Sequence, residues 1–126
     1  MRLLLDTAAF IYAAESPHWL TKRAARAVQD SGNILELSSI SLSEIAIKAA
    51  LGKLRLSSDA VWQALKEIGV RILPYSAEHA FYLFELPLLH ADPFDRHIIA
   101  QALSEKIPVV TPDDKFSLYR EIKVIW

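Results

Sequence analysis

The stretch Arg2-Leu3-Leu4-Leu5-Asp6-Thr7 decides how the rest of the chain is interpreted. Three leucines in a row are typical of a buried strand, and the acidic residue that follows them stands where a helical pattern begins. Three further carboxylates, Glu44, Asp95 and Asp113, occupy the same kind of junction between an apolar run and a helix start. In an open α/β sheet, chemistry gathers at the carboxyl ends of parallel strands. The four acids are therefore expected at one rim of one sheet.

Short apolar runs alternate with helical periods along the chain. Strands are expected at residues 2–5, 34–37, 70–73, 109–110 and 124–125, and helices at 7–14, 21–30, 41–51, 58–68, 76–86 and 94–105. This alternation predicts an α/β fold in which a mostly parallel sheet carries helices on both faces. At 126 residues, the chain is expected to form one domain, residues 1–126.

The composition excludes several classes of protein. Hydrophobic residues make up 52% of the chain, which is typical of a dense globular core rather than of disorder. The net charge of −1 gives no overall basic field, so any nucleic acid would have to bind a local patch. Cysteine is absent, which excludes disulfides and thiolate metal sites. No apolar stretch approaches the length of a membrane span, so we expect a cytoplasmic protein with no membrane contact.

Each acid also has a purely structural interpretation. Asp6 could cap the helix that follows it. Glu44 closes the sequence Ser41-Leu42-Ser43-Glu44, which has the pattern of a capping box. Asp95 lies in the first turn of its helix, where the helix dipole favours a negative charge, and Asp113 could serve a turn. Taken singly, none of the four indicates a function.

Two features favour a shared site over four separate caps. Asp95 lies on the same helical stripe as Ile98 and Ile99, so it should point toward the sheet, where an unpaired charge is costly. The four acids also recur at equivalent junctions, which topology would bring to one rim. Oxygen ligands alone suit a hard cation, Mg²⁺ or Mn²⁺, that can activate water for attack on a phosphodiester. We expect Asp6 and Asp95 to be the principal metal ligands.

Six stretches of the chain carry information on its family. They are Leu3-Leu4-Leu5-Asp6-Thr7, Ser43-Glu44-Ile45-Ala46-Ile47-Lys48, Leu51-Gly52-Lys53-Leu54, His90-Ala91-Asp92-Pro93-Phe94-Asp95-Arg96, Ile99-Ala100-Gln101-Ala102-Leu103 and Val110-Thr111-Pro112-Asp113. Together they resemble a PIN domain of the VapC toxin type, and the block that begins at His90 is the most specific of them. The resemblance extends over the whole chain.

The resemblance implies a PIN-like three-layer fold with strand order 3-2-1-4-5. It also implies a Mg²⁺-dependent endoribonuclease, the toxin of a type II toxin–antitoxin pair, with RNA as substrate, a cognate antitoxin as partner and a homodimer. By position, the catalytic quartet of the family falls on Asp6, Glu44, Asp95 and Asp113, while Asp92 is a supporting acid. Where relatives often have His and Trp, this chain has Ala8 and Tyr12, which affects only the inferred substrate choice.

Other functions remain open from the sequence. A housekeeping RNA-processing nuclease would share the site, and a non-catalytic binding module would need no carboxylates. A phosphoacceptor domain would want an acidic pair after its first strand, which Asp6-Thr7 does not offer. Lys48, one turn after Glu44, could contact phosphate or simply pair with that acid. Apolar side chains that include Phe10, Trp19 and Trp62 could simply fill the core, but we expect them to form an exposed patch for a second subunit or an antitoxin helix.

Overall fold

The computed structural model describes all 126 residues. Its strands are β1 (Arg2–Leu5), β2 (Ile34–Ser38), β3 (Val70–Leu73), β4 (Val109–Val110) and β5 (Val124–Ile125). Its α-helices are α1 (Thr7–Glu15), α2 (Lys22–Gln29), α3 (Ser39–Ala50), α4 (Ser58–Ile68), α5 (Ala77–Glu85) and α6 (Pro93–Glu105), and two 3-10 helices are η1 (Pro17–Trp19) and η2 (Asp114–Leu118). Every expected strand and helix is present. The two 3-10 helices were not anticipated.

The five strands form one sheet in the order β3-β2-β1-β4-β5. All four strand pairs are parallel, which confirms both the sheet type and the order that the resemblance implied. Parallel neighbours must be joined by crossovers, and here helices supply most of them. All the strands therefore end at the same edge of the sheet, where β1 is the central strand.

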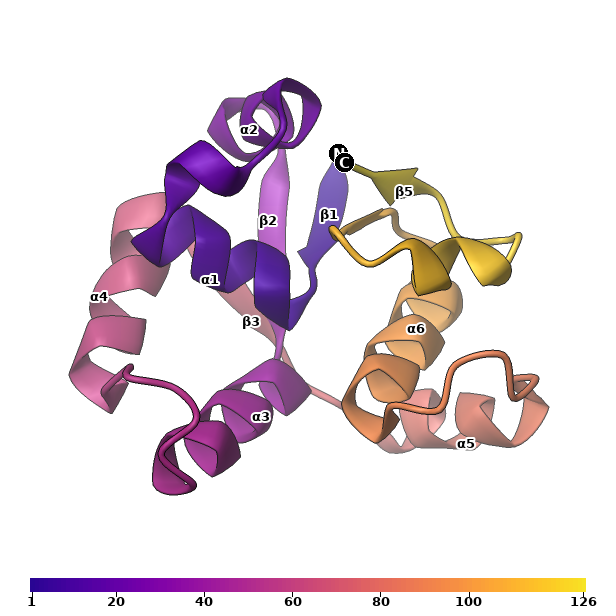
Figure 1. The fold of residues 1–126 in the computed structure, drawn as a ribbon. Helices are drawn as coiled ribbons and strands as arrows, with labels where there is room; N and C mark the ends of the chain where they lie inside the picture. Colours follow the sequence, from indigo (N-terminus) through magenta and orange to yellow (C-terminus); the bar gives the residue numbers. More distant parts are fainter.

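Alternate leucines of β1 build the two halves of the core. Leu3 and Leu5 are buried against side chains from α1, α2 and α4 on one face of the sheet. Leu4 is buried on the other face, mainly against α6, η2 and the partly buried side chains of α5. Figure 1 shows α1, α2 and α4 on one side of the strands and α5 and α6 on the other. The predicted arrangement of helices on both faces is confirmed. None of these helices combines the length and the apolar character needed to cross a bilayer.

Helix α3 begins earlier than the sequence indicated, at Ser39 rather than Ser41. Strand β2 runs directly into the helix, and the Ser38 hydroxyl accepts a hydrogen bond from the Ile40 amide at 3.1 Å. Because Ser38 already caps the helix, the expected capping box from Ser41 to Glu44 is wrong. Ser41 instead lies within the helix, where its hydroxyl accepts a 2.8 Å hydrogen bond from the hydroxyl of Thr7. Glu44 is thereby free of a capping role.

The apolar residues expected to form an exposed patch fall into two groups. Trp19 and Trp62 are 58% and 60% exposed, as expected. Phe10 is fully buried, so its assignment to the patch was wrong. The reason lies in α1, where Phe10 follows Asp6 by one turn and faces the sheet together with Ala9. The exposed apolar residues of the molecule also include Phe81 and Phe84 of α5, at 70% and 85%.

Candidate active site

The four acids from separate parts of the sequence line one cavity of about 270 Å³. Asp6 follows β1, Glu44 lies on α3, Asp95 lies in the first turn of α6, and Asp113 precedes η2. The remaining lining residues are Thr7, Ala8, Ile11, Tyr12, Lys48 and Asp92. The topology brings these residues together because β1 and β4 end side by side at the centre of the sheet.

Asp6 is the most deeply buried of the four acids, with 3% of its surface exposed. Its carboxylate caps α1 by accepting a 2.7 Å hydrogen bond from the Ala9 amide, and it accepts a 2.5 Å hydrogen bond from the Thr111 hydroxyl. The pKa of Asp6 is nevertheless raised to about 7. Burial is the main cause, the charges of Asp95 and Asp113 act in the same direction, and the two hydrogen bonds oppose the shift. The capping interpretation is correct, but it is incomplete, since a cap alone would favour the ionised form.

Glu44 lies on the buried side of α3 and has one satisfied oxygen. Its Oε2 receives a 2.6 Å ion pair and hydrogen bond from Lys48 Nζ, so the simple pairing of these two residues along the helix is present. Its Oε1 is buried and has no hydrogen-bond partner. A buried carboxylate oxygen without a partner is costly, and the cavity is the place from which a cation or a donor can reach it.

Asp95 is held at the amino end of α6 by the residue that caps this helix. Asp92 Oδ1 accepts a 3.0 Å hydrogen bond from the Asp95 amide, and Pro93 occupies the first helical position, which suits a residue without an amide hydrogen. Burial raises the pKa of Asp95 to about 6, with a further contribution from the charge of Asp92. Asp92 therefore caps the helix and also adds a second negative charge beside Asp95.

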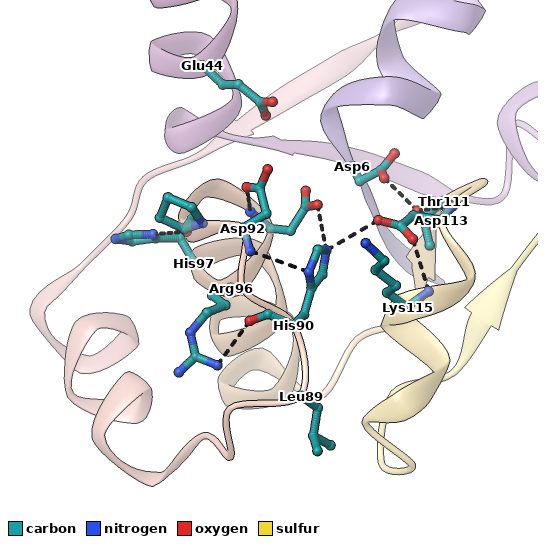
Figure 2. Close-up of polar contacts among 12 residues, drawn as sticks. Asp6, Glu44, Leu89, His90, Asp92, Arg96, His97, Thr111, Asp113 and Lys115 are labelled. Carbon is teal, nitrogen blue, oxygen red and sulfur yellow. Dashed lines mark hydrogen bonds and ion pairs between the residues drawn. The ribbon is translucent and has the colours of Figure 1, made fainter.

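Asp113 and Asp95 both contact the side chain of His90. His90 Nε2 lies 2.8 Å from Asp95 Oδ2 and 3.3 Å from Asp113 Oδ2, as Figure 2 shows for the labelled His90 and Asp113. One ligand atom from each of these three residues lies within 4.8 Å of the others, which is close enough for a shared ion. Asp6 and Glu44 line the same cavity without belonging to this close group. The choice of Asp6 and Asp95 as principal ligands stays a prediction.

Two residues of the site were not singled out from the sequence. His90 entered the sequence analysis only as the first residue of the block that carries the resemblance, and no role was assigned to it. Its place two residues before the cap of α6 lets its ring fold back on the first helical turn. Thr111 joins two acids, since its hydroxyl donates to Asp6 and accepts a 3.0 Å hydrogen bond from the Asp113 amide. The signal for Thr111 was its position directly after β4, at the same sheet edge as Asp6.

Arg96 follows Asp95 in the chain but does not line the acidic cavity. Its guanidinium donates to the carbonyl oxygens of Leu86 and Pro87 at 3.4 and 3.1 Å. These contacts hold the loop between α5 and α6 against the latter helix. Lys48 is the cationic residue that lines the acidic cavity.

Comparison with known proteins places the chain in a family. Residues 3–122 match the model of the PIN domain. The chain belongs to the PIN domain family. A search of curated proteins finds no match. The suspected family is thereby confirmed on almost the whole chain.

Solved structures share the fold at low sequence identity. They include VapBC2 from Rickettsia felis bound to a promoter DNA fragment, with a TM-score of 0.71 and 22% identity over 98% of this chain and 97% of that one. DNA-bound VapBC from Salmonella typhimurium has a TM-score of 0.67 and 20% identity over 98% and 96% of the two chains. VapBC-5 from Mycobacterium tuberculosis has a TM-score of 0.63 and 19% identity over 98% of this chain and 97% of that one. At this identity, the likeness to these structures shows a shared fold alone.

Proposed function

We propose that this PIN domain is a metal-dependent endoribonuclease and the toxin component of a type II toxin–antitoxin pair. One observation carries the proposal. Acids from four elements surround a single cavity, and burial raises the pKa of Asp6 to about 7 and that of Asp95 to about 6. Groups held this way lose electrostatic strain when a cation enters, whereas four independent helix caps would show no such frustration.

The residues present fit a hard divalent cation. The donor set around the cavity is dominated by carboxylate oxygens, which suits Mg²⁺ or Mn²⁺. The unpartnered Oε1 of Glu44 offers a free ligand atom of the right kind. In the proposal, Asp6 and Asp95 hold the metal, and Glu44 and Asp113 complete the shell directly or through water. When bound, the metal would lower the pKa of a water molecule and stabilise charge on the leaving oxygen of a phosphodiester.

Lys48 has a place in the same proposal. Its ammonium group lies at the cavity and pairs with Glu44 Oε2, so it offsets one negative charge of the quartet. Its side chain is 45% exposed, which leaves the group accessible from solution. A strand of RNA brings phosphates toward an acidic site, and a cation beside the acids reduces the repulsion that such a substrate meets.

An antitoxin segment is the proposed inhibitor, and an apolar groove offers a binding place for it. The groove has a volume of about 280 Å³ and lies between α3 and α4. Its lining residues are Leu42, Ile45, Ala46, Ala49, Leu56, Ser58, Val61, Trp62 and Leu65. The helix that carries Glu44 and Lys48 thus also forms a wall of the groove. A segment bound there could extend a basic side chain to the acids and take the place of the metal.

A second copy of the chain is the other proposed partner. Phe81 and Phe84 lie on the exposed side of α5 with their ring centroids 6.0 Å apart, and Leu88 is 77% exposed in the loop that follows. Exposed apolar side chains in such proximity are typical of an interface rather than of a free surface. We propose that this face, rather than the buried Phe10, contributes to a homodimer.

Cleavage of RNA by the purified protein tests the activity. We expect Mg²⁺ or Mn²⁺ to support cleavage, EDTA to abolish it and Asp95→Asn to remove it in the presence of metal. Cleavage that persists in EDTA and in the variant would refute the metal-dependent proposal. A housekeeping RNA-processing nuclease would behave identically in this assay. Growth arrest on expression, relieved by the product of a neighbouring gene, separates the toxin from that alternative.

A further inference from the structure

The side chain of His90 joins two acids that belong to different elements. Its Nε2 lies 2.8 Å from Asp95 Oδ2 on α6 and 3.3 Å from Asp113 Oδ2 on the segment after β4. Only 6% of the residue is exposed, although it lies in the loop between α5 and α6. Figure 2 shows the ring between the labelled Asp113 and the start of α6. A buried side chain that bridges the two elements is well placed to set the distance between their carboxylates.

The other ring nitrogen determines where the proton lies. The Asp92 amide points at His90 Nδ1 with a separation of 3.4 Å, so Nδ1 accepts and carries no hydrogen in the neutral ring. The proton of the neutral imidazole is then on Nε2, which faces the two carboxylates. This arrangement makes Nε2 a hydrogen-bond donor. A nitrogen that binds a metal must instead present its lone pair, so the tautomer inferred from this contact argues against His90 as a direct ligand.

The loop that carries His90 is fixed on several sides. The His90 amide donates to the Tyr119 hydroxyl at 3.1 Å, and the same hydroxyl donates to the carbonyl of Pro87 at 2.8 Å. Arg96 donates to the Tyr119 oxygen at 3.2 Å. The rings of His90 and Phe116 pack in an edge-to-face arrangement, with centroids 6.2 Å apart and an interplanar angle of 71°. The imidazole is therefore held before any metal arrives.

We propose that His90 is a positioning residue of the metal site, which orients Asp95 and Asp113 through Nε2–H without binding the metal itself. The inference rests on the proposed function and adds to it a residue outside the acidic quartet. Hydrogen bonds from an outer shell orient carboxylate ligands, and losing such a partner typically weakens metal binding by about 10- to 100-fold. Asp95 takes the shorter contact with Nε2, a hydrogen bond of 2.8 Å. Asp113 lies 3.3 Å from the same nitrogen, and its other oxygen, Oδ1, accepts a 3.0 Å hydrogen bond from the Lys115 amide.

The test compares three variants by calorimetric titration with Mn²⁺. His90→Leu removes the donor, and we expect Mn²⁺ binding to weaken by about 10- to 100-fold. His90→Gln keeps a donor at the position of Nε2, and we expect affinity within about threefold of the wild type. His79→Leu is the matched control, because His79 is equally buried and its Nε2 lies 3.0 Å from Glu105, away from the cavity. This control should unfold at lower temperature and bind Mn²⁺ normally.

Nitrogen NMR of the histidine side chains separates positioning from direct ligation. We expect the Nε2–H tautomer of His90 both without metal and with saturating Mg²⁺. A switch to the Nδ1–H form on adding Mg²⁺ would overturn the proposal in favour of a ligand role. If the wild-type protein binds Mn²⁺ and cleaves RNA, and His90→Leu binds Mn²⁺ with the same affinity, the proposal is overturned. Absence of both binding and cleavage in the wild type would instead refute the proposed function.

Discussion

Replacing Asp6 by Asn should stabilise the metal-free protein at neutral and alkaline pH. The pKa of Asp6 is raised from its ordinary value of 3.8 to about 7, chiefly by burial. Each pKa unit corresponds to about 1.4 kcal/mol, so an ionised Asp6 in a rigid fold disfavours folding by about 4 kcal/mol at pH 8. Water that enters the cavity screens part of this charge. We therefore expect Asp6→Asn to raise the free energy of unfolding by about 1 to 3 kcal/mol.

The pH dependence gives the prediction its sign. Below pH 4, Asp6 is protonated in both the folded and the unfolded chain, and it has no electrostatic cost. Between pH 4 and pH 7, the unfolded chain ionises while the folded chain keeps the proton, so stability falls as pH rises. Above pH 7, both states are ionised, and the loss is complete. Asn cannot ionise and caps helices as well as Asp does, so the variant should have a flatter stability profile over this range.

Urea denaturation followed by tryptophan fluorescence measures the effect, in EDTA at pH 4, 6 and 8. Asp59→Asn is the matched control, because Asp59 is exposed in the first turn of α4 and does not line the cavity. We expect the gain from Asp6→Asn to grow with pH and the control to stay within about 0.5 kcal/mol of the wild type. A variant that is less stable than the wild type at pH 8 would refute the reasoning. The hydrogen bonds of Asp6 would then outweigh its burial.

Four further outcomes are expected. In calorimetry, Mg²⁺ at 100 times its dissociation constant should stabilise the wild type by about 2.7 kcal/mol, which corresponds to a rise in melting temperature of roughly 10 °C. Asp95→Asn should lose this rise, and without metal it should melt no lower than the wild type. Lys48→Met frees Glu44, so Mn²⁺ should bind at least as tightly while the KM for RNA rises several-fold. Trp62→Glu should weaken capture of the antitoxin in a binding assay and leave RNA cleavage intact. Phe84→Glu should shift the mass measured by light scattering from a dimer to a monomer, and an unchanged mass would remove α5 from the interface.

The fold was accessible from the sequence because its signals are local. The leucines of β1 alternate between the two core clusters, and each helix has its own apolar spacing and stop. Strand order came from the resemblance, since periodicity alone does not say which strands pair. The start of α3 was misjudged because two serine motifs compete there. The capping pattern at Ser41 is visible in the sequence, whereas the direct join between β2 and α3 at Ser38 is set by the sheet.

The site was only partly accessible for a physical reason. Asp6 follows a strand and Asp95 opens a helix, so topology alone was sufficient to suggest that these two acids come near each other. Glu44 lies inside α3, because the helix begins five residues before it. The bridge through His90 depends on a loop held by Tyr119 and Arg96, and nothing in the local spacing reports such contacts. The same limit applies to Phe10. Its helix has apolar residues on several sides, and tertiary packing decides which of them is buried.

The electrostatic cost of the buried acids is linked to the packing of the core beside them. Asp6 directly follows the central strand β1, whose three leucines are all buried, so the carboxylate with the largest rise in pKa is joined to a fully buried part of the chain. Thr111 then ties the Asp6 carboxylate to the backbone amide of Asp113, which limits how far the segment after β4 can move away from Asp6. A site built on flexible loops would relax in the absence of a cation and would have to reassemble to bind one. Here the frustration persists in the folded state, and its relief on cation entry can contribute directly to binding.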